Sequence, residues 1–108
     1  MIIKLKQTFL VLLLLTVAAI ADPASSIVGS WLESSSGARW TFRADGTGFM
    51  ELGETRTTAR FNWRLRGSTL EVSTAATSVP YSVLQQGSDS LTIRNERVSQ
   101  VYQLQRSH

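Results

Sequence analysis

After residue 26 the chain alternates apolar and polar residues in short runs, and Gly, Ser, Asp and Asn separate the runs. A period of two puts successive side chains on opposite faces of a strand, whereas helical spacing is almost absent. The pattern predicts eight strands, at residues 27–33, 39–43, 48–52, 58–66, 69–73, 79–85, 90–94 and 98–105. Eight successive strands can close into a barrel without exposed edges. We therefore predict an all-β fold, a small eight-stranded up-and-down antiparallel barrel.

The hairpin at residues 67–68 specifies its own register. A two-residue loop that begins with Gly, as in a type II′ turn, sets Leu65 opposite Leu70 on one face. Arg64 then lies opposite Glu71 on the other face, where the two can form a cross-strand charge pair. A shift by one residue would place leucine opposite arginine, so we expect only this register.

The turn around Gly46 is compatible with two loop lengths. A two-residue loop turns Glu51 inward beside Trp40. A three-residue loop with a left-handed Gly46 pairs Trp40 with Met50 instead. We favour the three-residue loop, although it leaves Phe49 exposed.

A third hairpin turns at residues 86–88, where we predict another three-residue loop. This loop sets Val83 opposite Leu91. It also sets Tyr81 opposite Ile93, which again puts apolar side chains on one face. The interior set that follows from the three registers is Ile27, Trp31, Trp40, Phe42, Met50, Leu52, Ala59, Phe61, Trp63, Leu65, Leu70, Val72, Tyr81, Val83, Leu91, Ile93, Tyr102 and Leu104.

This predicted interior is rich in large aromatic side chains. An eight-stranded barrel is only just wide enough to be filled by its own side chains or to hold one small ligand. We expect the rings to form the core and any ligand cavity to be small and close to the mouth. The longer loops define that mouth because alternate connections gather at one end of the barrel, and they are residues 34–38, 53–57, 73–78 and 95–97.

Residues 1–21 have the features of a secretory signal peptide. Lys4 and Lys6 precede an apolar run at residues 9–20, and an Ala-x-Ala motif ends at Ala21. The run is shorter than the about 20 apolar residues that span a bilayer, which leaves an uncleaved anchor as the less favoured alternative. We therefore expect a periplasmic or secreted protein with no membrane span after cleavage.

Cleavage after Ala21 predicts two further segments, a flexible N-terminal arm at residues 22–26 and a barrel domain at residues 27–106. It also removes both lysines, which leaves nine arginines and eight acidic residues. A net charge near +1 gives no ground for a nucleic-acid partner. The chain has no cysteine, which excludes disulfides, thiolate metal sites and a cysteine nucleophile.

Four motifs occur in order along the mature chain: Gly29-Ser30-Trp31, residues 40–48 from Trp to Gly, Phe61-Asn62-Trp63, and residues 102–106 from Tyr to Arg. With them the chain resembles the small bacterial lipocalin-like domains of the calycin kind over most of its length. The resemblance implies that Trp31, two residues after Gly29, closes one end of the barrel and that Arg106 stacks over it. Such a cation–π contact contributes about 0.5–2 kcal/mol. The chain is shorter than full-length lipocalins and lacks their helix and disulfide.

The resemblance implies a binding protein, and two kinds of partner follow. One is a small apolar or amphipathic molecule at the barrel mouth. The other is a protein, because exported barrels that inhibit secreted metalloproteases also carry a free arm before Gly-x-Trp, although those inhibitors have a disulfide. In that case the protein is an inhibitor or immunity protein that acts through its surface or arm.

Residues suited to catalysis are scarce. The one histidine, His108, ends the chain, where fraying makes a positioned general base improbable. The chain has no Gly-x-Ser-x-Gly motif. The run from Asp45 to Gly48 lacks the further acidic ligands that calcium needs. We predict that the protein is not an enzyme and that it has no cofactor and no metal site.

Four residues are candidates for contact with a ligand. Glu33 shares its strand face with Trp31 and is predicted to point into the mouth, where its charge stays hydrated. The inward rings of Trp40, Trp63 and Tyr81 supply the apolar part of the predicted site. For Glu33 a solvated position at the end of a loop is the alternative, and for the rings it is a role in the core.

An arginine stripe is predicted on the outer face of the fourth strand and its lead-in. Its members share one strand parity and are Arg56, Arg60, Arg64 and Arg66. The stripe could bind an acidic protein or a lipid phosphate. The alternative is a solvated face, partly neutralised by Glu71, since exposed charge pairs are common and weak.

Overall fold

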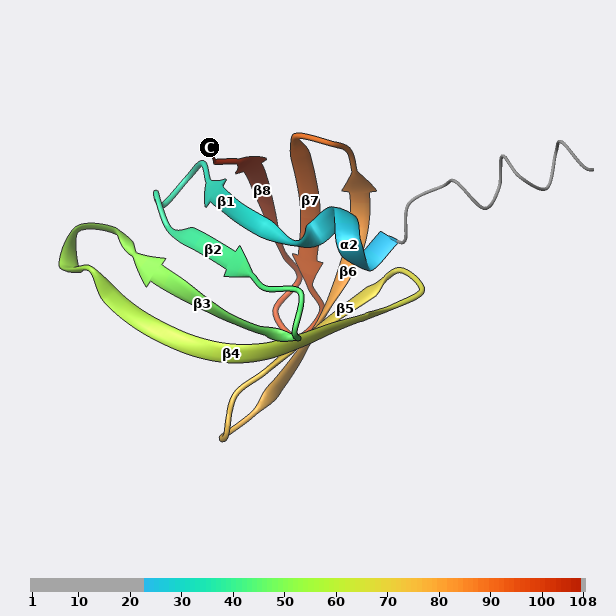
Figure 1. Cartoon of the computed structure of the whole chain (residues 1–108), viewed down its shortest axis with the longest axis horizontal. Coiled ribbons are helices and arrows are strands. Elements are labelled where there is room, and N and C mark those ends of the chain that lie inside the picture. Colours follow the sequence, from blue (N-terminus) through green and yellow to red (C-terminus); the bar gives the residue numbers. More distant parts are fainter. Residues whose placement is uncertain (1–22, 108) are drawn as a thin grey trace, which may run out of the picture.

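The computed structural model describes residues 23–107, which form a closed barrel (Figure 1). The barrel confirms the predicted eight-stranded up-and-down antiparallel fold, because each strand pairs with the next and the last pairs with the first. The predicted signal peptide at 1–21, Asp22 and His108 lie outside the described residues. The strands are β1 (Gly29–Glu33), β2 (Arg39–Phe42), β3 (Thr47–Leu52), β4 (Thr57–Arg66), β5 (Thr69–Ser73), β6 (Ser78–Gln86), β7 (Ser90–Asn95) and β8 (Gln100–Arg106).

Both favoured registers in the first half of the barrel are confirmed. Leu65 lies opposite Leu70 across the two-residue loop between β4 and β5. Trp40 lies opposite Met50 across the three-residue loop between β2 and β3, and Gly46 there has a φ of 88°. Glycine suits that left-handed conformation because it carries no Cβ.

The register predicted for the β6–β7 hairpin is wrong. Val83 lies opposite Ile93 rather than Leu91, and Tyr81 lies opposite Asn95. The turn comes later than predicted, and a β-bulge interrupts the ladder between Val83 and Gln85. The shifted turn alone would have reversed which side chains of β6 point inward. The bulge adds one residue to β6, so Val83 and Tyr81 still point into the barrel.

The barrel interior is filled with most of the predicted apolar set. The fully buried side chains include Trp31, Phe42 and Leu70. Two predictions are wrong, because Leu52 is 42% exposed and Ala59 is also exposed. Both residues lie on the inner face of the β3–β4 hairpin, where it extends past the end of β5.

The ends of two hairpins diverge at the mouth of the barrel. In Figure 1 the β3–β4 hairpin sweeps to the left, whereas the β5–β6 hairpin points down. The pairing of β4 with β5 ends at Asn62 opposite Ser73, so residues 57–61 of β4 extend past their neighbour. A short 3-10 helix, η1 (Gly53–Thr55), connects β3 to β4.

A short helix lies where the N-terminal arm is predicted. Residues Pro23–Ile27 form a short helix, α2, and Ile27 is fully buried. Ala24 packs against the same core. The predicted first strand therefore begins later, at Gly29. Among residues 23–107 no helix has the length and hydropathy that crossing a bilayer requires.

Candidate functional site

Trp31 and Arg106 pack together at the end of the barrel next to α2. The Arg106 Cζ atom lies 4.2 Å from the centre of the Trp31 ring, which is the stacking that the resemblance implies. The Trp31 indole donates a hydrogen bond to the Ile27 carbonyl at 2.9 Å. The Arg106 guanidinium donates to three backbone carbonyls, those of Ser26 (2.8 Å), Val28 (3.0 Å) and Ser88 (2.8 Å). At this end of the barrel Trp31 and Arg106 therefore bind each other and the protein's own backbone.

Gly29 makes room for this arrangement. Its φ is 133°, which side chains rarely adopt, and a Cβ atom there would lie 2.6 Å from Arg106 Nη1. Any larger residue would therefore strain the backbone and displace the guanidinium. Gly29, Trp31 and Arg106 thus form one packed unit.

Glu33 is directed to its own loop rather than to an open mouth. It is 4% exposed, and its carboxylate accepts hydrogen bonds from the Ser35 and Ser36 hydroxyls and from the Ser35 backbone N–H at 3.2 Å. Desolvation opposes ionisation, but the hydrogen bonds outweigh it and lower the pKa of Glu33. This carboxylate holds the β1–β2 loop in place.

Trp40, Trp63 and Tyr81 lie inside the barrel in one cluster of rings. The centres of the Trp40 and Tyr81 rings are 5.8 Å apart, and those of Phe42 and Trp63 are 5.4 Å apart, both edge to face. Burial is the main cause of the raised pKa of Tyr81, and the nearby Tyr102 phenol adds to it. Aromatic pairs of this geometry stabilise the core beyond the area they bury.

The two indole N–H groups in this cluster differ. Trp63 Nε1 donates to the carbonyls of Arg43 (3.0 Å) and Thr47 (3.1 Å), and so it fixes the β2–β3 turn. Trp40 Nε1 is buried and has no partner among the described residues. A buried donor without a partner costs free energy. Trp40 therefore carries a polar group suited to an acceptor atom from outside the chain.

The arginine stripe on β4 is not uniform. Arg64 forms an ion pair with Glu71 at 2.8 Å, and the hydrogen bond from Arg64 is the main cause of the lowered pKa of Glu71. Arg56 lies at the end of η1 with a φ of 56°. Arg60 and Arg66 form no ion pair with any residue that the structure describes. Only part of the stripe is therefore available to a partner.

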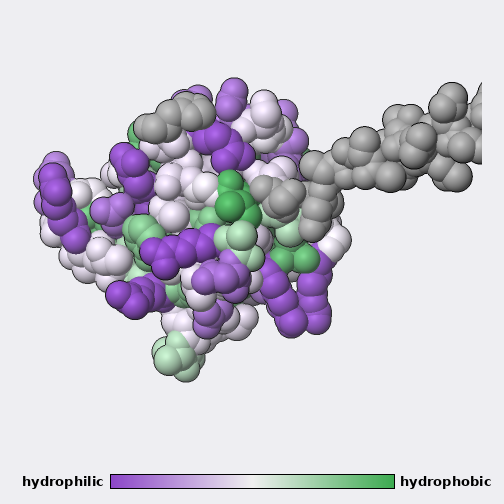
Figure 2. Space-filling view, viewed as in Figure 1, coloured by the Kyte–Doolittle hydropathy of each residue, from purple (hydrophilic) through white to green (hydrophobic). Residues whose placement is uncertain are grey.

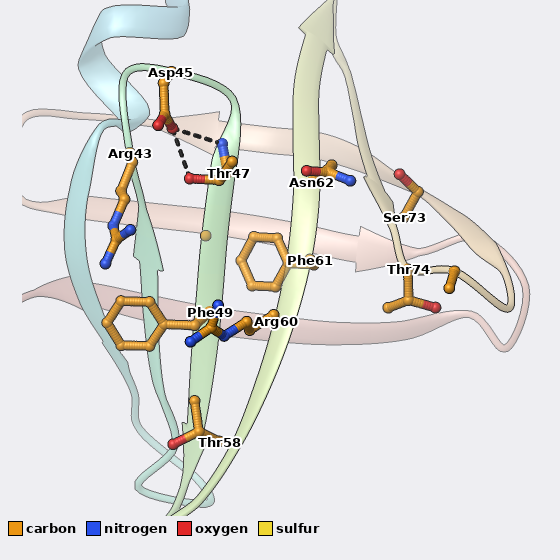
Figure 3. Close-up of a pocket in the computed structure, with 12 residues that line it drawn as sticks. Arg43, Asp45, Thr47, Phe49, Thr58, Arg60, Phe61, Asn62, Ser73 and Thr74 are labelled. Atoms are coloured by element: carbon orange, nitrogen blue, oxygen red, sulfur yellow. Dashed lines mark hydrogen bonds between the residues drawn. The ribbon is translucent and has the colours of Figure 1, made fainter.

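An open hollow of about 800 Å³ lies beside Arg60, between the β3–β4 hairpin and the start of the β5–β6 loop (Figure 3). Phe49 and Arg60 are opposite each other in the pairing of β3 with β4. Arg43 follows β2, and its Cζ atom lies 5.3 Å from the centre of the Phe49 ring. The residues that line the hollow are Arg43, Asp45, Thr47, Gly48, Phe49, Thr58, Arg60, Phe61, Asn62, Ser73, Thr74 and Ala75.

The charge of this hollow is positive. Its one carboxylate, Asp45, accepts hydrogen bonds from the Thr47 hydroxyl at 2.6 Å and the Thr47 N–H at 3.0 Å, and these lower the pKa of Asp45. Arg43 and Arg60 have no ion-pair partner within residues 23–107. In Figure 3 both guanidinium groups lie near the Phe49 side chain.

The surroundings of the hollow are hydrophilic as well. Figure 2 shows hydrophilic side chains over much of the β3–β4 hairpin, with small hydrophobic areas between them. A second, smaller hollow on this hairpin contains Arg39, Glu51 and Arg56. Four of the arginines in the chain therefore lie at these two hollows.

Sequence reasoning identified Arg60 but missed Arg43 and Phe49 as members of one site. A signal was present, because the favoured register of the β2–β3 hairpin already left Phe49 on the outer face. The parity that places Arg60 outward also places it beside that ring. The threonines at 58 and 74 carried no comparable signal, since exposed threonines are common in β-proteins.

No protein-family model matches this chain, and no curated protein is significantly similar to it. Membership of the lipocalin-like family therefore stays a prediction. The structure shows the coarser feature that is compatible with that family, a closed antiparallel barrel of eight strands.

Proposed function

We propose that this protein is an exported lipocalin-like binding protein, without enzymatic activity, that recognises an acidic partner protein through the outer face of β3 and β4. The observation that carries the proposal is the hollow in which Arg43 and Arg60 flank Phe49 without an ion pair among the described residues. An inhibitor or immunity protein is one form that such a protein can take.

The chemistry of the hollow suits a protein surface that carries carboxylates. Guanidinium groups bind carboxylates through two parallel hydrogen bonds, and their planar faces stack on aromatic rings. Arginine and aromatic residues are also enriched among the residues that dominate binding energy in interfaces. Exposed ion pairs alone contribute little, so the Phe49 ring is needed to exclude water around Arg43.

The barrel interior supports this choice over a large apolar ligand. Trp40, Phe42, Phe61 and Tyr81 are all less than 9% exposed, and they fill the middle of a barrel that is narrow by construction. The hollow of about 800 Å³ lies outside this packed interior.

One observation favours a second candidate, a small ligand bound at the mouth. Trp40 Nε1 is buried and has no partner within residues 23–107, so a ligand with an acceptor atom would satisfy it. Entry of the ligand would require the neighbouring rings of Tyr81 and Tyr102 to move. Native mass spectrometry of the purified protein tests this candidate by detecting a co-purified small molecule.

A capture experiment from periplasmic extract tests the proposed function. Arg60→Glu reverses the charge at the hollow, and Arg66→Glu makes the same change on the same face of β4 but away from the hollow. We expect Arg60→Glu to abolish capture of the partner and Arg66→Glu to retain it. Equal capture by both variants would contradict the proposal.

A further inference from the structure

Strand β4 has a free edge beside the hollow. Its pairing with β5 ends at Asn62 opposite Ser73, whereas its pairing with β3 continues to Thr57. β5 stops there because the chain turns, and the Thr74 N–H donates to the Thr77 carbonyl at 2.8 Å. Among the strands of residues 23–107, residues 57–61 therefore have a neighbour on one side only.

The ladder identifies which main-chain groups face the free side. The Trp63 N–H donates to the Gly46 carbonyl at 2.9 Å, so the main-chain groups of Trp63 point toward β3. Successive residues of a strand point these groups to alternate sides, and the pairing of β3 with β4 has no bulge. The N–H and C=O groups of Thr58 and Arg60 therefore point away from β3, toward the open side.

The hollow provides the space that another strand needs. Thr58, Arg60 and Asn62 line one side of it, and residues 73–75 line the other. Figure 3 shows Ser73 and Thr74 across this space from β4. Unpaired strand edges are templates for pairing with another chain.

We propose that an extended acidic segment of the partner adds to the sheet as a strand along β4, antiparallel to it. This inference rests on the proposed function and specifies how the partner is held. Main-chain hydrogen bonds to Thr58 and Arg60 provide the pairing, as in other cases of strand addition. An acidic side chain opposite Arg60 provides the specificity.

The barrel contains its own example of this pairing. Glu71 of β5 lies opposite Arg64 on the outer face and binds it at 2.8 Å. Arg60 lies on the same face of the same strand, but none of the described strands continues β5 beside it. A carboxylate in the added strand would repeat the Arg64–Glu71 pair at Arg60. The alternate side chains of that strand would cover the exposed Ala59 on the inner face.

Other occupants of this edge fit less well. Two copies paired through β4 would bring arginines such as Arg60 and Arg64 of both copies together, and like charges on neighbouring strands are destabilising. The N-terminal residues 1–22 contain one acidic residue, Asp22. The charge of the hollow therefore points to a separate partner.

A peptide titration followed by fluorescence anisotropy tests strand addition. The probe is a fluorescein-labelled peptide of alternating Glu and Val residues. In the proposed pairing the Glu N–H groups point to β4 and the Val N–H groups point away. We expect N-methylation of the Glu residues to weaken binding by about tenfold or more, and N-methylation of the Val residues to change it by less than about threefold.

Matched protein variants make the reciprocal test. Thr58→Pro removes an N–H that faces the free edge, and edge positions of this kind tolerate proline. Thr58→Ala removes the side chain but keeps the N–H. We expect the proline variant to bind the unmodified peptide about tenfold more weakly and the alanine variant to bind it within about twofold of the wild type.

The outcomes separate the two proposals. If Arg60→Glu abolishes capture of the partner while the methylated peptides and Thr58→Pro bind normally, the proposed function stands and strand addition is wrong. If the wild-type protein does not bind the Glu/Val peptide at all, strand addition is also wrong. Thermal melting of each variant shows whether it folds, and the methylated peptides keep the test valid if Thr58→Pro does not.

Discussion

Two arginine–aromatic pairs in this barrel have the same chemistry and opposite surroundings. At the α2 end, Arg106 stacks on the buried Trp31 and also donates to three carbonyls. On the outer face, Arg43 lies over the half-buried Phe49 without a hydrogen-bonded acceptor among the described residues. The Arg106 guanidinium therefore donates its hydrogen bonds within the fold, whereas the donors of Arg43 have no acceptor within residues 23–107. Two pairs of the same residue types therefore differ in whether their donors are already bound by acceptors of the described residues.

The largest expected effect is at Trp31. Trp31→Ala removes a fully buried ring and leaves a cavity, so we expect the free energy of unfolding to fall by about 3–5 kcal/mol. Urea denaturation measures the change. Phe49→Ala is the control on the other side of the comparison, and we expect a clearly smaller loss because that ring is only half-buried. Similar losses in the two variants would remove the distinction between the two arginine–aromatic pairs.

Arg106→Ala should have the next largest effect. It removes the stacking on Trp31 and leaves three backbone carbonyls without their donor. Lost contacts of this kind cost about 1–3 kcal/mol in total. Arg43→Ala loses the contact with Phe49 and an exposed charge interaction with Asp45, and it should change the free energy of unfolding by less than about 0.5 kcal/mol.

Glu33 makes the stability of the fold depend on pH. The pKa of Glu33 is lower in the folded state, so the carboxylate stabilises the fold above its pKa in the unfolded chain, and this contribution is lost as pH falls through the folded value. We therefore expect Glu33→Gln to be less stable than wild type at pH 7, with the difference shrinking below about pH 4. A difference that stays constant between pH 7 and pH 3 would show that the charge of Glu33 is not involved.

The smallest effect on stability, and the largest on binding, is expected for the double variant Arg43→Ala plus Arg60→Ala. Neither side chain forms an ion pair with the described residues, so the melting temperature should change little. Capture of the partner should be lost. In the wild type, capture should weaken as salt rises from about 50 mM to 500 mM, because the Debye length shortens. Capture that does not change with salt concentration would argue against recognition by charge.

Much of the fold followed from the alternation of residues. The β4–β5 hairpin was predictable because every cross-strand pair, including Arg64 with Glu71, is consistent in only one register. The β6–β7 hairpin was not, because Leu84 lies within a bulge that no local pattern marks. The exposure of Leu52 and Ala59 also escaped prediction, since alternation gives the face of a side chain but not where the neighbouring strand stops.

The candidate site was predictable only in part. Arg60 was identified from strand parity, but the hollow beside it arises because β5 turns away after Ser73. The role of Glu33 depended on the serines of its own loop, which bind its carboxylate. Both features result from contacts that strand parity does not describe.

The order of strands and the inward rings follow from local periodicity, and the pairing of Trp31 with Arg106 follows from the resemblance that the short motifs carry. Within residues 23–107, it is the folded arrangement that shows which arginines are already bound, which strand edge has no neighbour and which interior polar group lacks a partner. The physical reason is that satisfaction of a charge or a donor depends on neighbours distant in sequence. Arg64 and Arg60 share one strand face, and only the end of β5 makes them different.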